Sequence, residues 1–336
     1  MTATAVSPEM MRAAVRERYG KPREIVEIKQ VPKPTLEADQ VLVRVRATSL
    51  NRGDYYTATA PIFLFRKMIG GSFRKPRTVA IGGDFAGVVE AVWDDVTDFE
   101  PGDEVFGART GAFGEYVAAR MIAKKPANVS FEEAATFGGS ALTALQALRD
   151  KGKLRPGQSV LVNGASGAVG PFAVQMAKAL GAGTVTAVCS TRNVEQTRGL
   201  GADRVIDYTK DDWTASGERH DLIVDIAATK PWRNIRRALK PGGTYVLVGS
   251  PIMNPLTGPL AKIGRQWLAS RFDRGRTFVF FVASFNTPDM ETLRALLASG
   301  QVKPVIERVY PFAELVDALE YMGEGHARAK LVVSVK

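Results

Sequence analysis

The sequence contains very few of the residues that form disulfides or bind zinc. Its 336 residues include one cysteine, Cys189, and two histidines, His220 and His326. One cysteine excludes an intrachain disulfide and a cysteine zinc cage, which agrees with a reducing compartment such as the cytoplasm. Cys189 ends an apolar run and is expected to be buried and inert. Both histidines lie in polar turns, so we expect them at the surface rather than in catalysis.

Long apolar runs are also missing. Hydrophobic residues make up 45% of the chain and charged residues 24%, as in a globular protein, and the length favours two domains. No stretch reaches the roughly 20 apolar residues that a membrane-spanning helix needs. The N-terminal sequence lacks the apolar core and small-residue cleavage site of a secretory signal. We therefore expect a cytoplasmic protein without a transmembrane segment.

The net charge of +10 would suit a nucleic-acid or anionic-membrane partner. However, the basic residues are scattered, and no zinc knuckle, helix-turn-helix signal or basic aromatic motif accompanies them. The charge therefore favours a solvated basic surface that also attracts a phosphorylated cofactor, with no dedicated nucleic-acid site. Peripheral contact with a membrane remains an alternative.

Glycines are plentiful, and one group of them lies in a specific context. Residues 159–163 are an apolar, β-rich run, residues 164–170 read GASGAVG, and residues 171–180 form an amphipathic helical pattern followed by a second strand at residues 184–189. In this setting the glycines allow a tight turn, close approach of a pyrophosphate, and close packing of helix on strand. The free N–H groups of the helix N-terminus face the anion. The pattern predicts a dinucleotide-binding unit.

The end of the second strand indicates which dinucleotide binds. An NAD site places Asp or Glu about 20 residues after the glycines, whereas a 2′-phosphate needs hydrogen-bond donors and positive charge. Counting from Gly170, this position is Ser190, followed by Thr191 and Arg192, with no carboxylate before Glu195. Two hydroxyl groups and a guanidinium favour NADP(H).

The rest of the chain divides into two kinds of pattern. Before residue 129, short strands are joined by Pro, Gly and Asp turns, which predicts a small, mostly antiparallel β domain. Ser130 and Glu133 form a capping box, and the pair Gly138 and Gly139 inside the helical run indicates a kink or a close backbone contact. Strands and helices then alternate, which predicts a doubly wound parallel sheet. The C-terminal strand could complete either sheet.

Several motifs in order give the whole chain a resemblance to the medium-chain dehydrogenase/reductase superfamily, in its zinc-independent quinone oxidoreductase branch. The motifs are SLNRGDYY, GGDFAGVVEAV, FEPGDEVFG, ATFGGSALTALQAL, GASGAVG, LGADRVIDY, LKPGGTYVLVGS and RAKLVVSV. The resemblance implies a Rossmann domain, residues 129–300, inserted into a GroES-like domain formed by residues 1–128 and 301–336. It also implies a homodimer and an active site in the cleft between the domains.

The positions that bind zinc in the zinc-dependent relatives carry other residues here. Asn51, Gly83 and Asp84 stand where Cys, His and Glu ligands would be, and the four-cysteine structural loop is absent. Such a set cannot form a tetrahedral nitrogen and sulfur site. The expectation is that no metal is bound and that the reaction proceeds without a Lewis acid.

The resemblance also implies which residues contact NADP(H). Four residues of the glycine turn would face the pyrophosphate, three residues after the second strand would face the 2′-phosphate, and the others would approach the adenine, ribose, nicotinamide or carboxamide. In chain order these residues are Thr143, Ser166, Gly167, Ala168, Val169, Ser190, Thr191, Arg192, Tyr208, Ala228, Gly249, Ser250, Phe281, Val282 and Lys330. Tyr208 could instead cap a sheet edge, and Lys330 is assigned only as a residue of the returning tail.

The expected reaction is hydride transfer from NADPH to a lipophilic quinone or α,β-unsaturated carbonyl compound. The developing enolate oxygen then needs hydrogen-bond donors, and the α-carbon needs a proton. Asn51 and Tyr56 are the candidate catalytic residues; Tyr56 would bind the carbonyl or deliver the proton, or else only shape the pocket. The apolar, basic segments 60–76 and 250–276 could be substrate lids, dimer contacts or membrane-touching faces. The alternative is a cofactor-binding structural or regulatory protein with weak catalysis that associates with RNA or a membrane surface.

Overall fold

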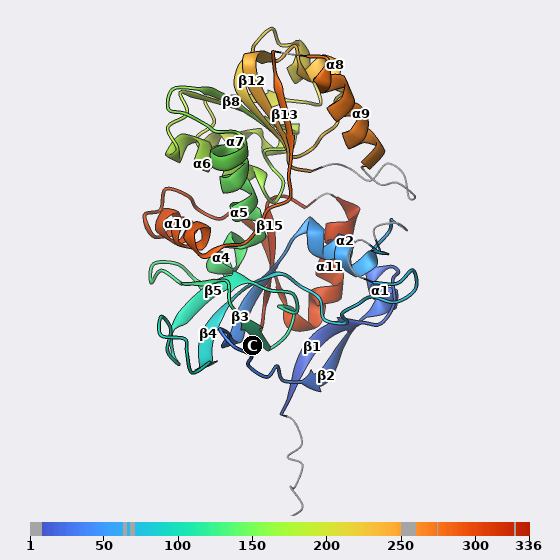
Figure 1. The fold of residues 1–336 in the computed structure, drawn as a ribbon, viewed down its shortest axis with the longest axis vertical. Helices are drawn as coiled ribbons and strands as arrows, with labels where there is room; N and C mark the ends of the chain where they lie inside the picture. The colour runs from blue at the N-terminus through green and yellow to red at the C-terminus, as the bar shows by residue number, and fades with distance from the viewer. Residues whose placement is uncertain (1–8, 63–65, 68–70, 250–259, 274, 326) are drawn as a thin grey trace, which may run out of the picture.

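The computed structural model describes residues 9–62, 66–67, 71–249, 260–273, 275–325 and 327–336. Two sheets form two lobes, with α5 (Gly139–Gln146) between them (Figure 1). The predicted Ser250 and His326 lie outside the described residues, as do parts of segments 60–76 and 250–276. Among the described residues, no helix is both long and apolar enough to cross a membrane.

The lower lobe in Figure 1 contains a seven-stranded sheet and a separate antiparallel pair of strands. The pair is β1 (Met10–Arg16) with β2 (Val26–Pro32). The main path of the larger sheet runs in the order β14-β15-β3-β4-β5-β7, and β6 pairs with β3. Its strands are β3 (Val41–Leu50), β4 (Asp84–Val92), β5 (Glu104–Ala108), β6 (Tyr116–Ala119), β7 (Ile122–Lys124), β14 (Ile306–Pro311) and β15 (Lys330–Ser334). Because β15 pairs with β3, the C-terminal tail completes the N-terminal sheet.

The upper lobe contains a six-stranded parallel sheet in the order β10-β9-β8-β11-β12-β13. Its strands are β8 (Ser159–Asn163), β9 (Thr184–Cys189), β10 (Arg204–Asp207), β11 (His220–Asp225), β12 (Leu239–Leu247) and β13 (Thr277–Phe280). The chain moves outward from β8 to β10 and then returns to place β11 beside β8. This reversal is the point where open α/β sheets bind ligands at the carboxyl ends of their strands.

The helices pack around these sheets and at their junction. They are α1 (Pro22–Ile25), α2 (Arg52–Thr59), α4 (Phe131–Ala134), α6 (Gly170–Ala179), α7 (Val194–Gly199), α8 (Trp232–Ile235), α9 (Leu260–Arg271), α10 (Thr287–Ala298) and α11 (Leu315–Glu324). α4 begins with the predicted capping box, since Glu133 N donates to Ser130 Oγ at 3.1 Å and Ser130 N donates to Glu133 Oε2 at 2.8 Å. α5 packs on α6, and α2 packs on α11.

One hydrophobic core runs through both lobes. It joins Phe106 of β5 to Phe137, Phe172 of α6 and Val162 of β8, all of which are buried. Phe137 and Phe172 meet edge to face with their ring centres 5.1 Å apart. Burial of shared apolar surface at about 25 cal/mol per Å² holds the lobes together. The segment before the glycine turn is therefore fixed relative to the N-terminal sheet.

The local predictions differ from the structure at two places. The pattern over residues 231–239 predicts a helix, but α8 covers only Trp232–Ile235, because Lys240 to Gly243 already lie in β12. His220 was predicted at the surface, which is wrong: it begins β11, is 3% exposed, and burial lowers its pKa to about 4. β13 ends at Phe280, so Phe281 and Val282 follow the strand. Cys189 is buried as predicted.

Candidate functional site

The glycine turn between β8 and α6 has the geometry that its sequence predicts. Gly164 has φ +87°, a conformation that side chains with a Cβ rarely adopt. A Cβ on Gly170 would lie 2.3 Å from the Gly164 carbonyl oxygen, so this position has no room for a side chain. The residues between them, Ser166 to Val169, are partly exposed at the N-terminus of α6. The turn therefore presents its backbone and Ser166 toward the place where an anion would bind.

A buried asparagine, which the sequence reasoning missed, links the turn to the end of β9. Asn193 Nδ2 donates to Ser166 Oγ at 3.1 Å and to Ser190 Oγ at 2.9 Å. Asn193 is 2% exposed, and its Oδ1 atom is buried without a hydrogen-bond partner among the described residues. A buried acceptor without a partner is costly, which is typical of a site that a ligand or water completes. The sequence signal was only its position three residues after Ser190.

The predicted 2′-phosphate residues lie on one exposed edge at the ends of β9 and β10. Ser190 is partly exposed, and Thr191 and Arg192 are exposed. Sequence reasoning missed Asp207, whose carboxylate accepts hydrogen bonds from Thr191 Oγ1 at 2.6 Å and from Thr209 Oγ1 at 2.7 Å. The Thr191 and Thr209 hydrogen bonds lower the pKa of Asp207, so this carboxylate is charged. The edge therefore combines one guanidinium with one hydroxyl-bound carboxylate.

Tyr208 directly follows Asp207 at the end of β10. Its side chain is 60% exposed, and its backbone N–H donates to the Cys189 carbonyl oxygen at 3.0 Å. The ring therefore stands in solvent beside Thr191 rather than in the core. An exposed aromatic ring at this edge can lie against a flat base.

A second polar cluster supports the end of β11. Asp225 Oδ1 accepts from Asn163 Nδ2 and from the Ala228 backbone N–H, both at 2.7 Å, and Asp225 Oδ2 accepts from Tyr245 Oη at 2.8 Å. Burial raises the pKa values of Asp225 and Tyr245. These bonds hold Ala228 at φ +49°, and they were not foreseen from the sequence. Ala228 is fully buried, so it shapes the backbone at this position rather than presenting a side chain.

The segment after β13 crosses toward α5. Phe281 is partly buried, packs on the shared core and has Lys151 Nζ 5.8 Å from its ring centre. Val282 is 81% exposed. Gln146 of α5 holds this crossing, because its Nε2 donates to the Ser284 carbonyl oxygen at 2.7 Å. Thr143, one turn earlier in α5, is partly exposed, and its hydroxyl donates to the Gly139 carbonyl oxygen at 2.6 Å.

The candidate catalytic tyrosine lies on α2. Tyr56 is partly exposed, and its hydroxyl oxygen accepts a hydrogen bond from Arg52 Nε at 3.1 Å. The Arg52 guanidinium lies 5.5 Å from the Tyr56 ring centre and donates to the Met322 carbonyl oxygen at 2.6 Å. Arg52 thus holds Tyr56 against α11. The other candidate, Asn51, precedes α2 and points the opposite way, into the protein.

Asn51 belongs to a group of polar residues that we call the buried cluster: Asn51, Asp84, Ser140 and Lys330. Asn51 Nδ2 donates to Asp84 Oδ2 at 2.8 Å, while Asn51 Oδ1 accepts from Lys330 Nζ at 2.7 Å and from Ser140 Oγ at 2.8 Å. Lys330 and Asp84 form an ion pair at 3.5 Å, with side chains 0% and 1% exposed. Burial lowers the pKa of Lys330. The structure thus places Lys330 beneath α2, with its ammonium group bound to Asn51 and Asp84.

Asp54 lies at the edge of the buried cluster. Its Oδ2 accepts the Asn51 backbone N–H at 2.8 Å, which closes the first turn of α2. Burial of the carboxyl and the nearby Asp84 carboxylate raise the pKa of Asp54 to about 7. Part of the Asp54 residue remains exposed, so the acid lies between the buried cluster and the surface.

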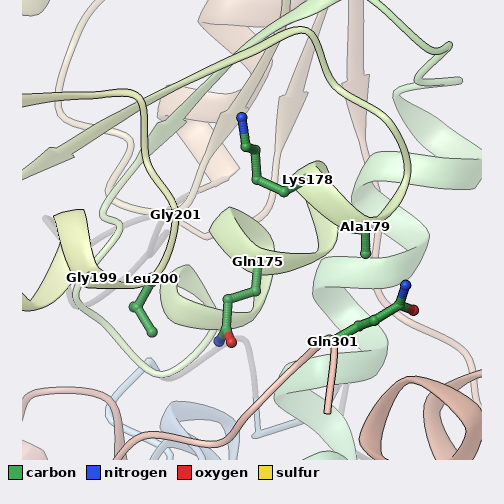
Figure 2. A pocket seen from close by; sticks show the side chains of 7 residues that line it. All are labelled: Gln175, Lys178, Ala179, Gly199, Leu200, Gly201 and Gln301. Carbon is green, nitrogen blue, oxygen red and sulfur yellow. The ribbon is translucent and has the colours of Figure 1, made fainter. Parts of the chain in front are cut away.

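Two hollows lie away from these residues. One, of about 330 Å³, is at the C-terminal end of α6, where Gln175 and Lys178 lie across from Leu200 and Gln301 (Figure 2). The other, of about 500 Å³, is lined by Arg16 and residues of β1 and β2. Neither contains the turn, the Asn193 hydrogen bonds or Tyr56, so we place the candidate site by its chemistry. Among the described residues, no three His, Cys, Asp or Glu side chains gather as metal ligands.

The turn and its surroundings fit a dinucleotide. The position of a Cβ on Gly167 meets no atom closer than 3.6 Å, so the backbone is open to an approaching group. Ser166, next to Gly167, is partly exposed, and Asn193 joins its hydroxyl group to that of the partly exposed Ser190. Helix N–H groups, hydroxyls and an exposed guanidinium are the donors that phosphate groups need.

Comparisons with known proteins agree with this geometry. The sequence profile of the alcohol dehydrogenase GroES-like domain matches residues 37–193, and that of zinc-binding dehydrogenases matches residues 200–333. The mitochondrial NAD(P)H oxidoreductase RTN4IP1 of Mus musculus is 32% identical over 100% of this chain and 92% of its own. The chloroplastic NADPH-dependent alkenal/one oxidoreductase of Arabidopsis thaliana is 31% identical over 99% and 82%. The quinone oxidoreductase structure from Coxiella burnetii superposes with a TM-score of 0.84 at 29% identity, covering 98% of this chain and 100% of that chain.

Proposed function

We propose a function for this chain from its family: it belongs to the medium-chain dehydrogenase/reductase superfamily, in the zinc-independent quinone oxidoreductase branch. The proposed function is NADPH-dependent reduction of quinones or α,β-unsaturated carbonyl compounds. The observation that carries the proposal is the glycine turn at α6, tied through Asn193 to the serine at the end of β9. Bound NADPH would supply a hydride. The names of the relatives from Arabidopsis thaliana and Coxiella burnetii support this substrate class.

In this proposal, the Rossmann domain, residues 129–300, binds the cofactor. Ser166 to Val169 bind the pyrophosphate, and Ser190, Thr191 and Arg192 bind the 2′-phosphate. Tyr208 lies along the adenine, and Thr143, Ala228, Gly249, Phe281 and Val282 surround the ribose and nicotinamide. Ser250, which was predicted there too, lies outside the described residues. The GroES-like domain, residues 1–128 and 301–336, contributes α2 and supports the substrate. The Asp207 carboxylate is held by the hydroxyl groups of Thr191 and Thr209, so Arg192 is the positive group of this edge proposed for the 2′-phosphate.

Tyr56 is the proposed donor to the substrate carbonyl oxygen. Its hydroxyl oxygen accepts from Arg52, and within the described part of the chain its own proton has no acceptor. The Arg52 cation polarises the O–H bond, which strengthens its donation to a developing enolate oxygen. Asn51 has both amide atoms engaged inside the protein, so it supports α2 rather than meeting the substrate.

The test is NADPH oxidation measured against a panel of quinones, enones and alkenals. We expect turnover with at least one class, and a Tyr56→Phe variant should lose about 100-fold in kcat while NADPH affinity stays unchanged. Full activity of this variant would remove the catalytic role of Tyr56. Absence of NADPH oxidation with every acceptor, despite NADPH binding, would favour a cofactor-binding protein without catalysis.

We also propose a homodimer, formed through α9 and the edge strand β13. Trp267 and Leu268 of α9 are 51% and 55% exposed, Phe272 directly after α9 is 83% exposed, and Phe280 of β13 is 45% exposed. The inner side of α9 carries Ile263, which packs on the core, and Gln266, whose Nε2 donates to the Lys230 carbonyl oxygen at 2.7 Å. An outward apolar face of this kind indicates a partner surface.

Light scattering should give twice the chain mass, and Phe272→Ser should shift the protein toward the monomer. A monomeric wild type that floats with anionic liposomes would instead favour a membrane-touching face.

The single cysteine supports a cytoplasmic location, although the relatives from Mus musculus and Arabidopsis thaliana are named mitochondrial and chloroplastic. Cell fractionation distinguishes these compartments.

A further inference from the structure

The buried cluster joins four separate parts of the chain. Asn51 precedes α2, Asp84 begins β4, Ser140 is in the first turn of α5, and Lys330 begins β15. Asp84 Oδ1 also accepts the Gly139 backbone N–H at 2.7 Å, which ties the carboxylate directly to the start of α5. Lys330 Nζ donates in addition to the Leu50 carbonyl oxygen at 3.2 Å and contacts Ser140 Oγ at 3.4 Å. The cluster thus fixes the start of α2 and the start of α5 with respect to each other.

The same strand connects this cluster to the glycine turn. Ala329, the residue before Lys330, donates its backbone N–H to the Ser166 carbonyl oxygen at 2.9 Å. Ala329 has φ +59°, an unfavourable conformation for alanine that the surrounding bonds must hold. One dipeptide therefore contacts the turn through its first residue and the base of α2 through its second. This arrangement puts the pyrophosphate turn, Thr143 on α5 and Tyr56 on α2 in one connected frame.

A buried ion pair is a poor source of net stability, because desolvation of both charges cancels most of their attraction. Apolar residues of similar size often serve folding equally well, whereas an ion pair with directed hydrogen bonds fixes one geometry. Here Asn51 lies between the two charges and bonds to both, so displacement of any of the three would break bonds in the others. The directed bonds are therefore better explained by positioning than by stability.

We propose that Asp84, Lys330 and Asn51 act as positioning residues that hold α2 and α5 at a fixed distance from the glycine turn. This inference rests on the proposed function, because the distance matters for aligning the nicotinamide with a substrate held near Tyr56. None of the three residues needs to touch cofactor or substrate. Their effect passes through Thr143, Tyr56 and the Ser166 carbonyl group.

The decisive variant removes both charges together. Lys330→Met alone leaves Asp84 buried and unpaired, so it should lower the melting temperature strongly or prevent folding. The double variant Asp84→Asn with Lys330→Met has no unpaired charge and should recover most of that loss. We expect it to bind NADPH within about threefold of wild type but to lose at least tenfold in kcat. Wild-type kcat in a folded double variant would overturn the proposal.

A second measurement does not depend on turnover. The fluorescence anisotropy of bound NADPH, read without acceptor, reports how firmly the nicotinamide is held. It should fall in the double variant, and unchanged anisotropy would contradict positioning. If wild type binds NADPH but reduces no acceptor, the proposed function fails while the anisotropy comparison still tests the positioning role.

Two further variants keep the test decisive if the double variant does not fold. Ser140→Ala removes one small contact of the cluster. It should lower kcat about threefold and lower the anisotropy of bound NADPH measurably, with NADPH affinity unchanged. Lys125→Met is the matched control, since the Lys125 side chain is 5% exposed and pairs with Glu104 at 2.9 Å in the same lobe. It should lose stability but keep kcat and anisotropy. If Ser140→Ala and wild type have the same kcat and the same anisotropy of bound NADPH, the proposal is wrong.

Discussion

The glycine turn and the buried cluster are connected through Ala329, the residue before Lys330, whose backbone N–H donates to the Ser166 carbonyl oxygen, and they use polar groups differently. In the turn, Ser166 and the neighbouring residues are partly exposed, and Asn193 Oδ1 has no hydrogen-bond partner in the part of the chain that the structure describes. In the cluster, Asn51 and Lys330 use their polar atoms on one another and on Asp84. Unpaired groups suit a surface that binds a ligand, and fully paired groups suit one that holds its shape. The two regions should therefore respond differently to mutation.

The largest effect should come from filling the turn. In Gly170→Ala the new Cβ would lie 2.3 Å from the Gly164 carbonyl oxygen, so helix and strand must separate. We expect a loss of about 3 kcal/mol in the free energy of unfolding, seen as a drop in melting temperature of roughly 4 °C. Gly199→Ala is the matched control, because a Cβ there meets nothing within 4 Å. It should be neutral or stabilising by up to about 1 kcal/mol; similar losses for both would contradict the packing argument.

The next effect tests the open edge of the cofactor region. Arg192→Ala should weaken NADPH binding about 10- to 100-fold, because a hydrogen bond to a charged phosphate contributes about 1.5–3 kcal/mol. NADH has no 2′-phosphate, so its affinity should change little. Titration of both cofactors, with Arg198→Ala as the control on the exposed face of α7, measures the difference. Equal losses of affinity for NADPH and NADH would show that Arg192 does not bind the 2′-phosphate.

The same contrast explains what the sequence could predict. The turn is local: Gly164 to Gly170 lie in one strand-turn-helix unit, so their spacing in the sequence already describes their geometry. The Asn51 to Lys330 contact joins residues 279 positions apart, and only pairing of β15 with β3 brings them together. Lys330 was therefore assigned from the tail motif alone, and its burial could not be read from the sequence. Asp225 was missed for the same reason, because Asn163 and Tyr245 bond to it from the neighbouring strands β8 and β12. Asp207 was missed because its bond to Thr191 joins the ends of two different strands.

The polar groups at the edge of the buried cluster should produce a pH dependence that the turn lacks. The folded-state pKa of Asp54 is raised to about 7, above the ordinary value of 3.8. Between these values the unfolded chain releases the proton and the folded chain keeps it, so stability falls as pH rises from about 4 to 7. From pH 5 to pH 8, the wild type should therefore lose melting temperature relative to Asp54→Asn.

A carboxyl with the opposite shift is the control for this prediction. Hydrogen bonds from Lys240 and Ser159 outweigh burial and lower the pKa of Asp221 to about 2. Its contribution to stability is complete above about pH 4 and is lost only as the pH falls toward 2. Asp221→Asn should therefore differ from wild type by a constant amount between pH 5 and pH 8. A constant difference for Asp54→Asn as well would show that Asp54 is ionised in the folded protein throughout this range.

The smallest effect belongs to the most exposed residue of the cofactor region. Tyr208 is 60% exposed, so in the free protein its ring contributes little to stability, and Tyr208→Ala should leave the melting temperature unchanged. Stacking of the ring on adenine would contribute about 1 kcal/mol, so the variant should bind NADPH roughly fivefold more weakly. Because the adenine is common to both cofactors, NADH should weaken by the same factor, unlike in Arg192→Ala. Unchanged affinity for both cofactors would show that Tyr208 only borders the sheet edge and that the open surface ends at Arg192.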